Sequence, residues 1–229
     1  MEDVLDVGNS LVFYVADLVI YLLSILVLFS SIFCIRAKYP ISKKQILIFK
    51  PLTLILIILI AIIFPTIDLK YKIIIVSGLL FSLLGDTYLI YPEKYFKKGL
   101  IAFLLGHICY IIAFIVSSGT HFTLYIFFPI TIIGFLYLQS IMPYSGKMKI
   151  PIIIYVTIIV IMGWAAMERL NSLHTVGSLI AVIGAVLFMI SDGVLALNKF
   201  KKPFYSAELI ILATYFSAQW LLAVSVFVV

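Results

Sequence analysis

The sequence predicts an all-α protein, a polytopic membrane bundle of about eight transmembrane helices. Of its 229 residues, 65% are hydrophobic and only 11% are charged, and the apolar residues form long runs separated by short charged connections. Soluble domains carry roughly 25% charged residues, and a helix needs about 20 apolar residues to cross the hydrocarbon. A single transmembrane domain is therefore expected to fill residues 1–229.

The spans follow one another along the whole chain. The first, 11–35, is too long and its leading segment MEDVLD too acidic for a cleaved signal peptide, so it is expected to remain as a helix. Cys34 and Cys109 fall inside spans without CxxC spacing, which predicts apolar packing and no disulfide. The further spans are expected at 46–67, 73–92, 99–117, 122–141, 150–167, 175–198 and 205–229.

Basic residues predict the orientation of these spans. Short connections rich in Lys and Arg stay on the cytoplasmic side, and here they alternate with connections that hold only Lys70, Lys72 and Arg169. Both termini are therefore expected outside, in the inner membrane if the protein is bacterial. Attraction to membrane lipids explains the +6 charge, so no nucleic-acid partner is expected. The basic set is Arg36, Lys38, Lys43, Lys44, Lys94, Lys97, Lys98, Lys147, Lys149, Lys199, Lys201 and Lys202.

A weak internal repeat runs through the chain. The segments LLGDTYLIYPEKYFKKG and MISDGVLALNKFKKP each contain a small residue, an Asp and a Phe-Lys-Lys end. Asp86 and Asp192 lie 106 positions apart, and Phe96 and Phe200 lie 104 apart. Four spans per unit preserve orientation, so we expect a parallel 4+4 repeat about an axis along the membrane normal.

Five ionisable residues from five spans are predicted to share one layer: Lys50, Asp86, His107, Asp192 and Glu208. Counted at about 1.5 Å per residue from the nearest basic or charged boundary, they lie some 9 to 13 Å inside the membrane. Isolated charges in lipid are costly and face a bundle interior or cavity. One shared pocket on the cytoplasmic side is therefore the expected arrangement.

Further polar residues fall on compatible faces of the same spans. Ser82 lies one helical turn before Asp86, Ser191 adjoins Asp192, and Tyr110 is three residues from His107. Tyr215 and Gln219 continue a stripe that begins at Glu208. These five residues, with Lys50, His107 and Glu208, are the candidate substrate-binding residues.

Several chemistries lack their motifs. A zinc site needs three or four clustered ligands, but His121 and His174 are predicted at the outer ends, which leaves His107 alone near the two Asp residues. No GxSxG elbow, phosphate loop or dinucleotide fingerprint occurs. The two carboxyls of Asp86 and Asp192 remain as candidate catalytic groups, without a metal or organic cofactor.

The segments that carry these residues resemble the YhhN family, which includes the lysoplasmalogenases. The resemblance covers about Lys50 to Leu222 and rests on KPLTLILIILI, SLLGDTYLI, KGLIAFLLGHICYIIAF, IYVTIIVIMGWAA, IGAVLFMISDGVLALNKF and TYFSAQWLL. It implies a membrane hydrolase that cleaves the vinyl ether of a lysophospholipid, a lysoplasmalogen, to a fatty aldehyde and a glycerophospho-ethanolamine or glycerophospho-choline. The proposed catalytic carboxylates of the family match Asp86 and Asp192.

A two-carboxyl layer suits that reaction. Vinyl ether cleavage protonates carbon, forms an oxocarbenium ion and adds water, a demand similar to that of glycosidases. One Asp is expected to act as general acid and the other as stabilising base, with either assignment open. Lys50 is expected to meet the phosphate, and His107, Tyr110, Tyr215 and Gln219 to orient water or the ether.

Two other functions use embedded carboxyls. A proton-coupled carrier fits a parallel repeat with buried acids, although the outer half of the chain offers few polar pathway residues. An intramembrane aspartyl protease also uses two helix-borne Asp residues, but Leu83 stands where its GxGD motif requires Gly, and no Pro-Ala-Leu element occurs.

Overall fold

The protein is an integral multi-pass membrane protein, as the sequence predicts. The computed structural model describes the backbone of residues 2–39, 42–63, 65–120 and 122–227, with side chains from Leu18 onward; the predicted position of His121 lies outside these residues. The described residues form eight helices long and apolar enough to span a membrane, and no strand. The helices are α1 Glu2–Lys38, α2 Lys43–Ile63, α3 Leu69–Leu89, α4 Pro92–Ser118, α5 Leu124–Ile141, α6 Lys149–Leu173, α7 Val176–Ala196 and α8 Ala207–Val224.

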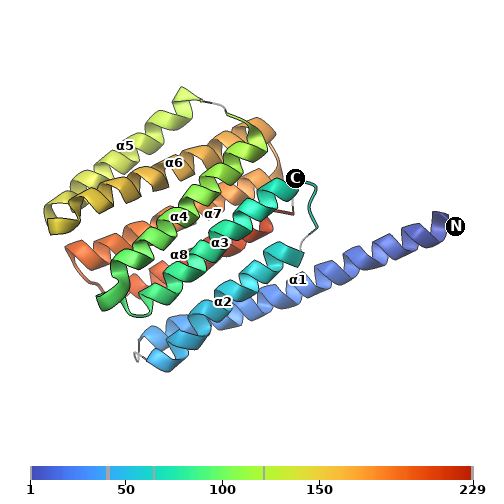
Figure 1. Cartoon of the computed structure of the whole chain (residues 1–229), viewed down its shortest axis with the longest axis horizontal. Helices are drawn as coiled ribbons and strands as arrows, with labels where there is room; N and C mark the ends of the chain where they lie inside the picture. The colour runs from blue at the N-terminus through green and yellow to red at the C-terminus, as the bar shows by residue number, and fades with distance from the viewer. Residues whose placement is uncertain (1, 40–41, 64, 121, 228–229) are drawn as a thin grey trace.

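The four connections that carry most of the basic residues lie at one end of the bundle (Figure 1). Two of them contain short helical turns. The α5–α6 connection holds two 3₁₀ turns, Met142–Tyr144 (η1) and Gly146–Met148 (η2), and α7 continues into a five-residue π-helix, Leu197–Lys201 (η3). A π turn places Lys199 and Phe200 where a regular α-helix would not, and such turns are frequent at functional sites.

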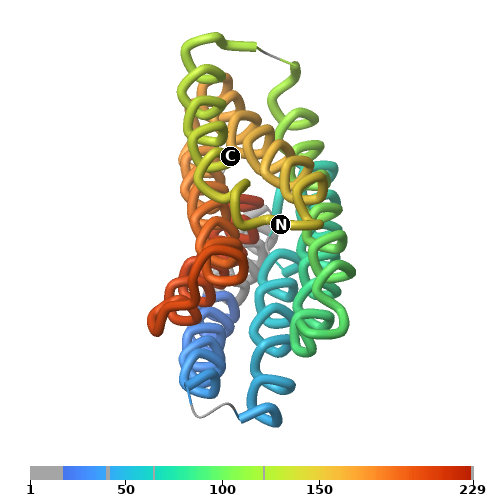
Figure 2. The backbone as a smooth tube through the Cα atoms, turned by 90° about the vertical axis from the view of Figure 1, so that its left-hand side faces the viewer, coloured from blue at the N-terminus to red at the C-terminus, as the bar shows by residue number. Residues whose placement is uncertain are grey.

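The helices pack in two corresponding sets. α3 packs on α4 as α7 packs on α8, and α2 packs on α3 and α8 as α6 packs on α7 and α4. Seen from the end with the basic connections, α1–α2 and α5–α6 lie on opposite sides, with α3–α4 and α7–α8 facing each other between them (Figure 2). This correspondence supports the expected repeat of four helices.

Small residues allow the central pairs to approach closely. A Cβ added to Gly78 of α3 would lie 2.8 Å from Cδ1 and 2.9 Å from Cζ of Tyr110 on α4. At Gly184 of α7, 106 positions later, it would lie 3.2 Å from the carbonyl oxygen of Ala218 on α8. The same position in both halves therefore serves close helix packing.

Helices α4 and α6 are among those that extend beyond their predicted ends. α4 begins at Pro92, seven residues before the expected start, with proline at a helical N-terminus where its missing N–H costs nothing. α6 continues six residues beyond 167. Glu168 accepts hydrogen bonds from the backbone N–H and hydroxyl of Thr123 at 2.6 and 2.9 Å. Arg169, expected in a connection, is buried with its guanidinium 4.2 Å from the ring centre of Tyr71.

Candidate active site

A polar pocket of about 330 Å³ lies toward the basic end of the bundle. It brings together six of the ten predicted site residues: Lys50, Asp86, Ser191, Asp192, Glu208 and Tyr215. These six residues come from helices α2, α3, α7 and α8, and α1 adds Lys38 to the same wall. The remaining lining residues are Leu89, Pro92, Phe96, Phe103, Leu195, Asn198, Lys199, Pro203, Ile211 and Leu212.

The carboxyl of Asp86 is fully buried and has two partners from other helices. Lys50 Nζ of α2 lies 3.0 Å from Asp86 Oδ1, and both side chains are less than a tenth exposed. The hydroxyl of Tyr215 on α8 donates to Oδ2 at 2.8 Å. A buried carboxylate is tolerable when it is paired with a cation and hydrogen-bonded, and this arrangement explains the presence of Asp86 inside an apolar helix.

The carboxyl of Asp192 has different partners. Tyr155 of α6 donates from its hydroxyl to Oδ2 at 2.9 Å, and Nε2 of His107 on α4 lies 3.3 Å from the same oxygen. The imidazole is fully buried, with its ring centre 4.5 Å from that of Phe188. Neither Lys nor Arg pairs with Asp192 among the described residues. The two carboxyls therefore differ in charge environment.

The two carboxyl sites correspond under exchange of the halves. Asp86 on α3 is met from α2 and from α8, whereas Asp192 on α7 is met from α6 and from α4. Lys50 and Tyr155 are 105 positions apart, and His107 and Tyr215 are 108 apart. The arrangement of both sites is thus alike, while both partners change: Lys50 corresponds to Tyr155, and His107 corresponds to Tyr215.

Tyr155 was not among the predicted site residues. A tyrosine in a strongly apolar chain does not stand out as lysine does, because most tyrosines here pack as aromatic residues. The internal repeat could have identified Tyr155, because it lies 105 positions after Lys50, on the corresponding helix of the second half.

Four predicted residues lie outside the pocket wall: His107, which meets Asp192 from α4, and three residues in helix contacts. Tyr110 donates from its hydroxyl to Oε1 of Gln219 at 2.7 Å, and both side chains are fully buried between α4 and α8. Ser82 is also fully buried, in the packed contact between α3 and α4. Ser191 lines the pocket, but its hydroxyl donates to the carbonyl oxygen of Ile211 at 3.0 Å. These groups hold helices together beneath the pocket.

Charged side chains lie at the mouth of the polar pocket. Glu208 is bound by Lys38 of α1 at 2.9 Å, and its side chain is 37% exposed. Lys199, carried by the π turn, lies 5.2 Å above the ring of Phe96 and pairs with no carboxylate of the described residues. The mouth therefore offers a lysine that is open to an anion.

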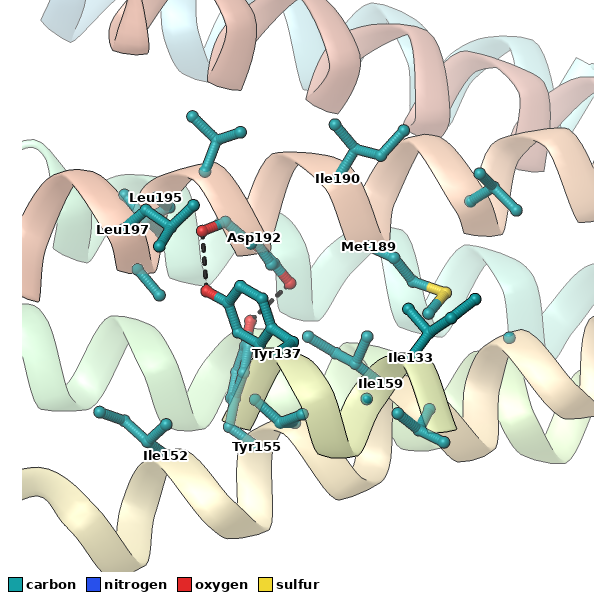
Figure 3. A pocket seen from close by; sticks show the side chains of 18 of the residues that line it. Ile133, Tyr137, Ile152, Tyr155, Ile159, Met189, Ile190, Asp192, Leu195 and Leu197 are labelled. Atoms are coloured by element: carbon teal, nitrogen blue, oxygen red, sulfur yellow. Dashed lines mark hydrogen bonds between the residues drawn. The ribbon is translucent and has the colours of Figure 1, made fainter. Parts of the chain in front are cut away.

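An apolar pocket of about 430 Å³ adjoins the polar one and shares Phe96, Asp192 and Leu195 with it. Figure 3 shows Tyr137 and Tyr155 close to Asp192, with Ile133, Ile159 and Met189 farther along the wall. Tyr137, also unpredicted, donates to the carbonyl oxygen of Gly193 at 2.8 Å. Asp192 therefore faces both a polar and an apolar chamber.

The described side chains contain no group of three or more His, Cys, Asp or Glu that is placed to hold a metal ion. His107 lies beside one carboxyl only, and Cys34 is buried while Cys109 is half-buried, both as free thiols. The two buried aspartates of the site are thus each paired with one basic side chain, Lys50 or His107, and Lys38 pairs with Glu208 at the mouth.

Known proteins match most of this chain. It is 35% identical over 153 residues to lysoplasmalogenase TMEM86A of Bos taurus, covering 65% of this chain and 62% of that protein. To lysoplasmalogenase TMEM86B of Homo sapiens it is 34% identical over 157 residues, 68% of this chain and 64% of the relative. The chain thus spans somewhat less than two thirds of the length of these relatives.

A bacterial relative matches along nearly its whole length. The membrane protein YhhN of Escherichia coli O157:H7 is 30% identical over 207 residues, 89% of this chain and 97% of that protein. No solved structure matches the chain. The model of the YhhN family covers residues 45–226, which include both carboxyl sites. The chain therefore belongs to the YhhN family.

Proposed function

We propose that the protein hydrolyses the vinyl ether bond of lysoplasmalogens, using Asp86 and Asp192 as its acid–base pair. The observation that carries this proposal is a pair of buried carboxyls in one pocket with unlike partners. Asp86 has a lysine and a tyrosine, and Asp192 has a tyrosine and a histidine. The names of the relatives TMEM86A and TMEM86B support the substrate class.

The reaction needs one proton donor and one anionic site. Protonation of the outer vinyl carbon converts RCH=CH–O–R′ into an oxocarbenium ion, whose positive charge a carboxylate stabilises. Water then adds to the carbon attached to oxygen, and its proton passes to the base. As the hemiacetal collapses to RCH₂–CHO and HO–R′, the base gives its proton to the leaving oxygen and the former donor takes the hydroxyl proton of the hemiacetal. One water is consumed and both carboxyls return to their starting states.

The different partners of the two carboxyls indicate which one is the proton donor and which one is the anionic base. The 3.0 Å contact with Lys50 keeps Asp86 as the carboxylate, which stabilises the cation and accepts the proton of the attacking water. Asp192 has no lysine or arginine partner in the described structure, and an uncompensated buried charge costs several kcal/mol or more. The Asp192–His107 pair is therefore neutral overall and holds one transferable proton, which makes Asp192 the acid.

The two tyrosines orient the carboxyls. Tyr155 binds Oδ2 of Asp192 and Tyr215 binds Oδ2 of Asp86. In each case Oδ1 is left for another partner, Lys50 for Asp86 and the vinyl ether for Asp192. His107 shares the transferable proton with Asp192 before each turnover, because its Nε2 lies 3.3 Å from Oδ2.

The test is incubation of the purified protein with three matched lysolipids, carrying the same chain as a 1-alkenyl ether, a 1-alkyl ether or a 1-acyl ester. We expect free fatty aldehyde from the alkenyl lipid alone. In D₂O the aldehyde should carry one deuterium at the carbon next to the carbonyl, because that carbon is protonated. Fatty acid release from the acyl lipid would contradict the mechanism, and lipid uptake by vesicles without aldehyde would favour a carrier.

A further inference from the structure

The apolar pocket runs along one stripe of α6. Tyr155, Ile159, Gly163 and Met167 are spaced four residues apart and all line it. Twelve residues separate the levels of Tyr155 and Met167, a distance of roughly 18 Å along a helix. One leaflet of the hydrocarbon is about 15 Å thick. The pocket therefore has the length of a single lipid chain and runs parallel to the chains of the bilayer.

The wall of this pocket is suited to hydrocarbon. Among the described residues that line it, Asp192 is the only Asp, Glu, Lys, Arg or His, and Tyr137 and Tyr155 supply the hydroxyls beside it. Away from that end, the wall consists of aliphatic side chains, methionines and glycines, as the labelled residues in Figure 3 illustrate. A ligand in this pocket must therefore be apolar along most of its length and polar only near Asp192.

The pocket opens sideways, toward lipid. α5 packs on α6 and touches the π turn η3, while its contact with α7 itself is slight at most (Figure 1). Two residues that line the pocket, Ile133 on α5 and Ile190 on α7, are 63% and 44% exposed. Both lie inside membrane-spanning segments, so the exposed surface faces the bilayer. A lipid chain can enter between α5 and α7 without leaving the hydrocarbon.

We infer that the apolar pocket binds the alkenyl chain of the substrate and that the stripe of Ile159, Gly163 and Met167 sets the chain length accepted. This inference rests on the proposed function. A lysoplasmalogen carries one chain and one phosphate headgroup, with the vinyl ether between them. With the chain in the apolar pocket and the phosphate at Lys199 in the polar pocket, the vinyl ether lies at Asp192, which lines both.

The glycine on this stripe leaves room that a side chain would fill. A Cβ added to Gly163 would lie 2.7 Å from Sδ of Met189, which also lines the pocket. The end of a methionine side chain moves readily, so a larger residue at 163 displaces it into the pocket without disturbing a helix backbone. Position 163 is about 12 Å beyond Tyr155 along α6.

The experiment compares Ile159→Trp, Gly163→Leu and Met167→Trp on lysoplasmalogens of increasing chain length. Each variant blocks the pocket at a different depth, roughly 6, 12 and 18 Å from Tyr155. We expect the longest chain accepted to increase in that order. Beyond each cut-off, kcat/KM should fall by roughly fourfold for every methylene excluded, which is the burial energy of one CH₂ expressed as a ratio.

Ile154→Trp is the matched control, because Ile154 is on the same helix, 50% exposed and absent from the pocket lining. It should keep the chain-length profile of the wild type. The inference is overturned if the three pocket variants keep that profile too, or if their cut-offs do not follow depth. Should Ile159→Trp not fold, Ile159→Phe blocks the same level with a smaller ring.

A readout without turnover separates this inference from the proposed hydrolysis. The melting temperature of the wild type and of each variant is measured with lysolipids of each chain length, since ligand binding raises it. A rise with chain length up to a cut-off that moves with the variant supports the chain pocket even if no aldehyde forms. A rise that is the same for all chain lengths refutes it.

Discussion

The two aspartates that line the polar pocket differ because their partners differ. Lys50 supplies a positive charge to Asp86, while at the corresponding place beside Asp192 stands the neutral hydroxyl of Tyr155. A lysine partner favours a carboxylate, and a tyrosine partner accommodates an acid that carries its proton. The proposed division of roles between the two carboxyls thus follows from tyrosine in place of lysine, together with His107 beside Asp192 where Tyr215 stands beside Asp86.

Removal of Lys50 tests the ion pair. We expect Lys50→Met to lower the free energy of unfolding by about 3–5 kcal/mol, because Asp86 is left as an uncompensated buried charge. The double variant Lys50→Met/Asp86→Asn should recover much of that loss, since both charges are gone. Thermal denaturation in lipid nanodiscs measures both. If the double variant is as unstable as the sum of the singles, the two side chains do not form a stabilising pair.

A matched pair of tyrosine variants tests the charge assignment. Tyr215→Phe removes a hydrogen bond to the carboxylate of Asp86, worth about 1.5–3 kcal/mol for a charged acceptor. Tyr155→Phe removes one to the neutral acid of Asp192, worth about 0.5–1.5 kcal/mol. Unfolding measurements should show the larger loss for Tyr215→Phe. Equal losses, or the reverse order, would contradict the assignment of Asp86 as the anion.

The residues that sequence could identify were those whose chemistry is out of place in lipid. Asp86, Asp192 and Lys50 stand out in apolar helices, and depth counting brought them to one layer. Ser82, Tyr110 and Gln219 were predicted in that layer but do not line the pocket, because a depth estimate does not tell which face of a helix meets a cavity. Tyr137 and Tyr155 were not predicted as site residues, because tyrosine is common in the apolar runs of this chain.

Helices α3 and α4 approach each other closely at a glycine. The ring of Tyr110 fills the space over Gly78 and is fixed by its bond to Gln219, so it cannot move aside. Gly78→Ala should therefore destabilise the protein by about 1–3 kcal/mol through overpacking. At Gly193 the nearest atom to an added Cβ is 3.7 Å away, and there the same substitution should be neutral or stabilising by up to about 1 kcal/mol.

Unfolding in detergent compares the two alanine variants directly. Since both replace a glycine inside a helix, the gain in helix propensity cancels and the difference reports packing alone. If Gly78→Ala proves as stable as Gly193→Ala, close contact with Tyr110 does not determine the distance between α3 and α4.

Helix number and order were predictable because hydrophobic length is the dominant signal in a membrane chain. The ends of the helices were less predictable. α6 runs six residues past its expected end because Glu168 is satisfied by Thr123 and Arg169 by the ring of Tyr71, and neither partner is close in sequence. The π turn after α7 likewise has no local signature that separates it from a regular helix end.

The molecule as a whole is a pair of four-helix units facing each other, and its orientation follows from its basic connections. We expect Lys97 on the cytoplasmic side and Thr120, after α4, on the outside. With a membrane-impermeant maleimide on intact cells, Thr120→Cys should be labelled and Lys97→Cys should react only after permeabilisation. The wild type, whose Cys34 and Cys109 lie within helices, supplies the background. Labelling of Lys97→Cys alone from outside would reverse the topology.

The repeat of four helices could be predicted from two Asp-containing segments whose aspartates are 106 residues apart. That each aspartate receives one partner from the other half of the chain could not be predicted. Sequence spacing relates positions within a unit, but His107 reaching Asp192 and Tyr215 reaching Asp86 depend on how the units pack. The adjoining apolar pocket arises for the same reason, because α5 packs on α6 and leaves space beside α7.

Aldehyde release by the wild type, Asp86→Asn, Asp192→Asn and the double variant tests the two-carboxyl mechanism most directly. Asparagine keeps the size of aspartate but cannot cycle a proton, so each single variant should lose roughly 10²–10⁴-fold in kcat. The double variant should be little worse than either single, because residues that act as one unit are not additive. Glu208→Gln, at the mouth, should lose far less. A folded Asp86→Asn or Asp192→Asn protein with near wild-type turnover would contradict the mechanism.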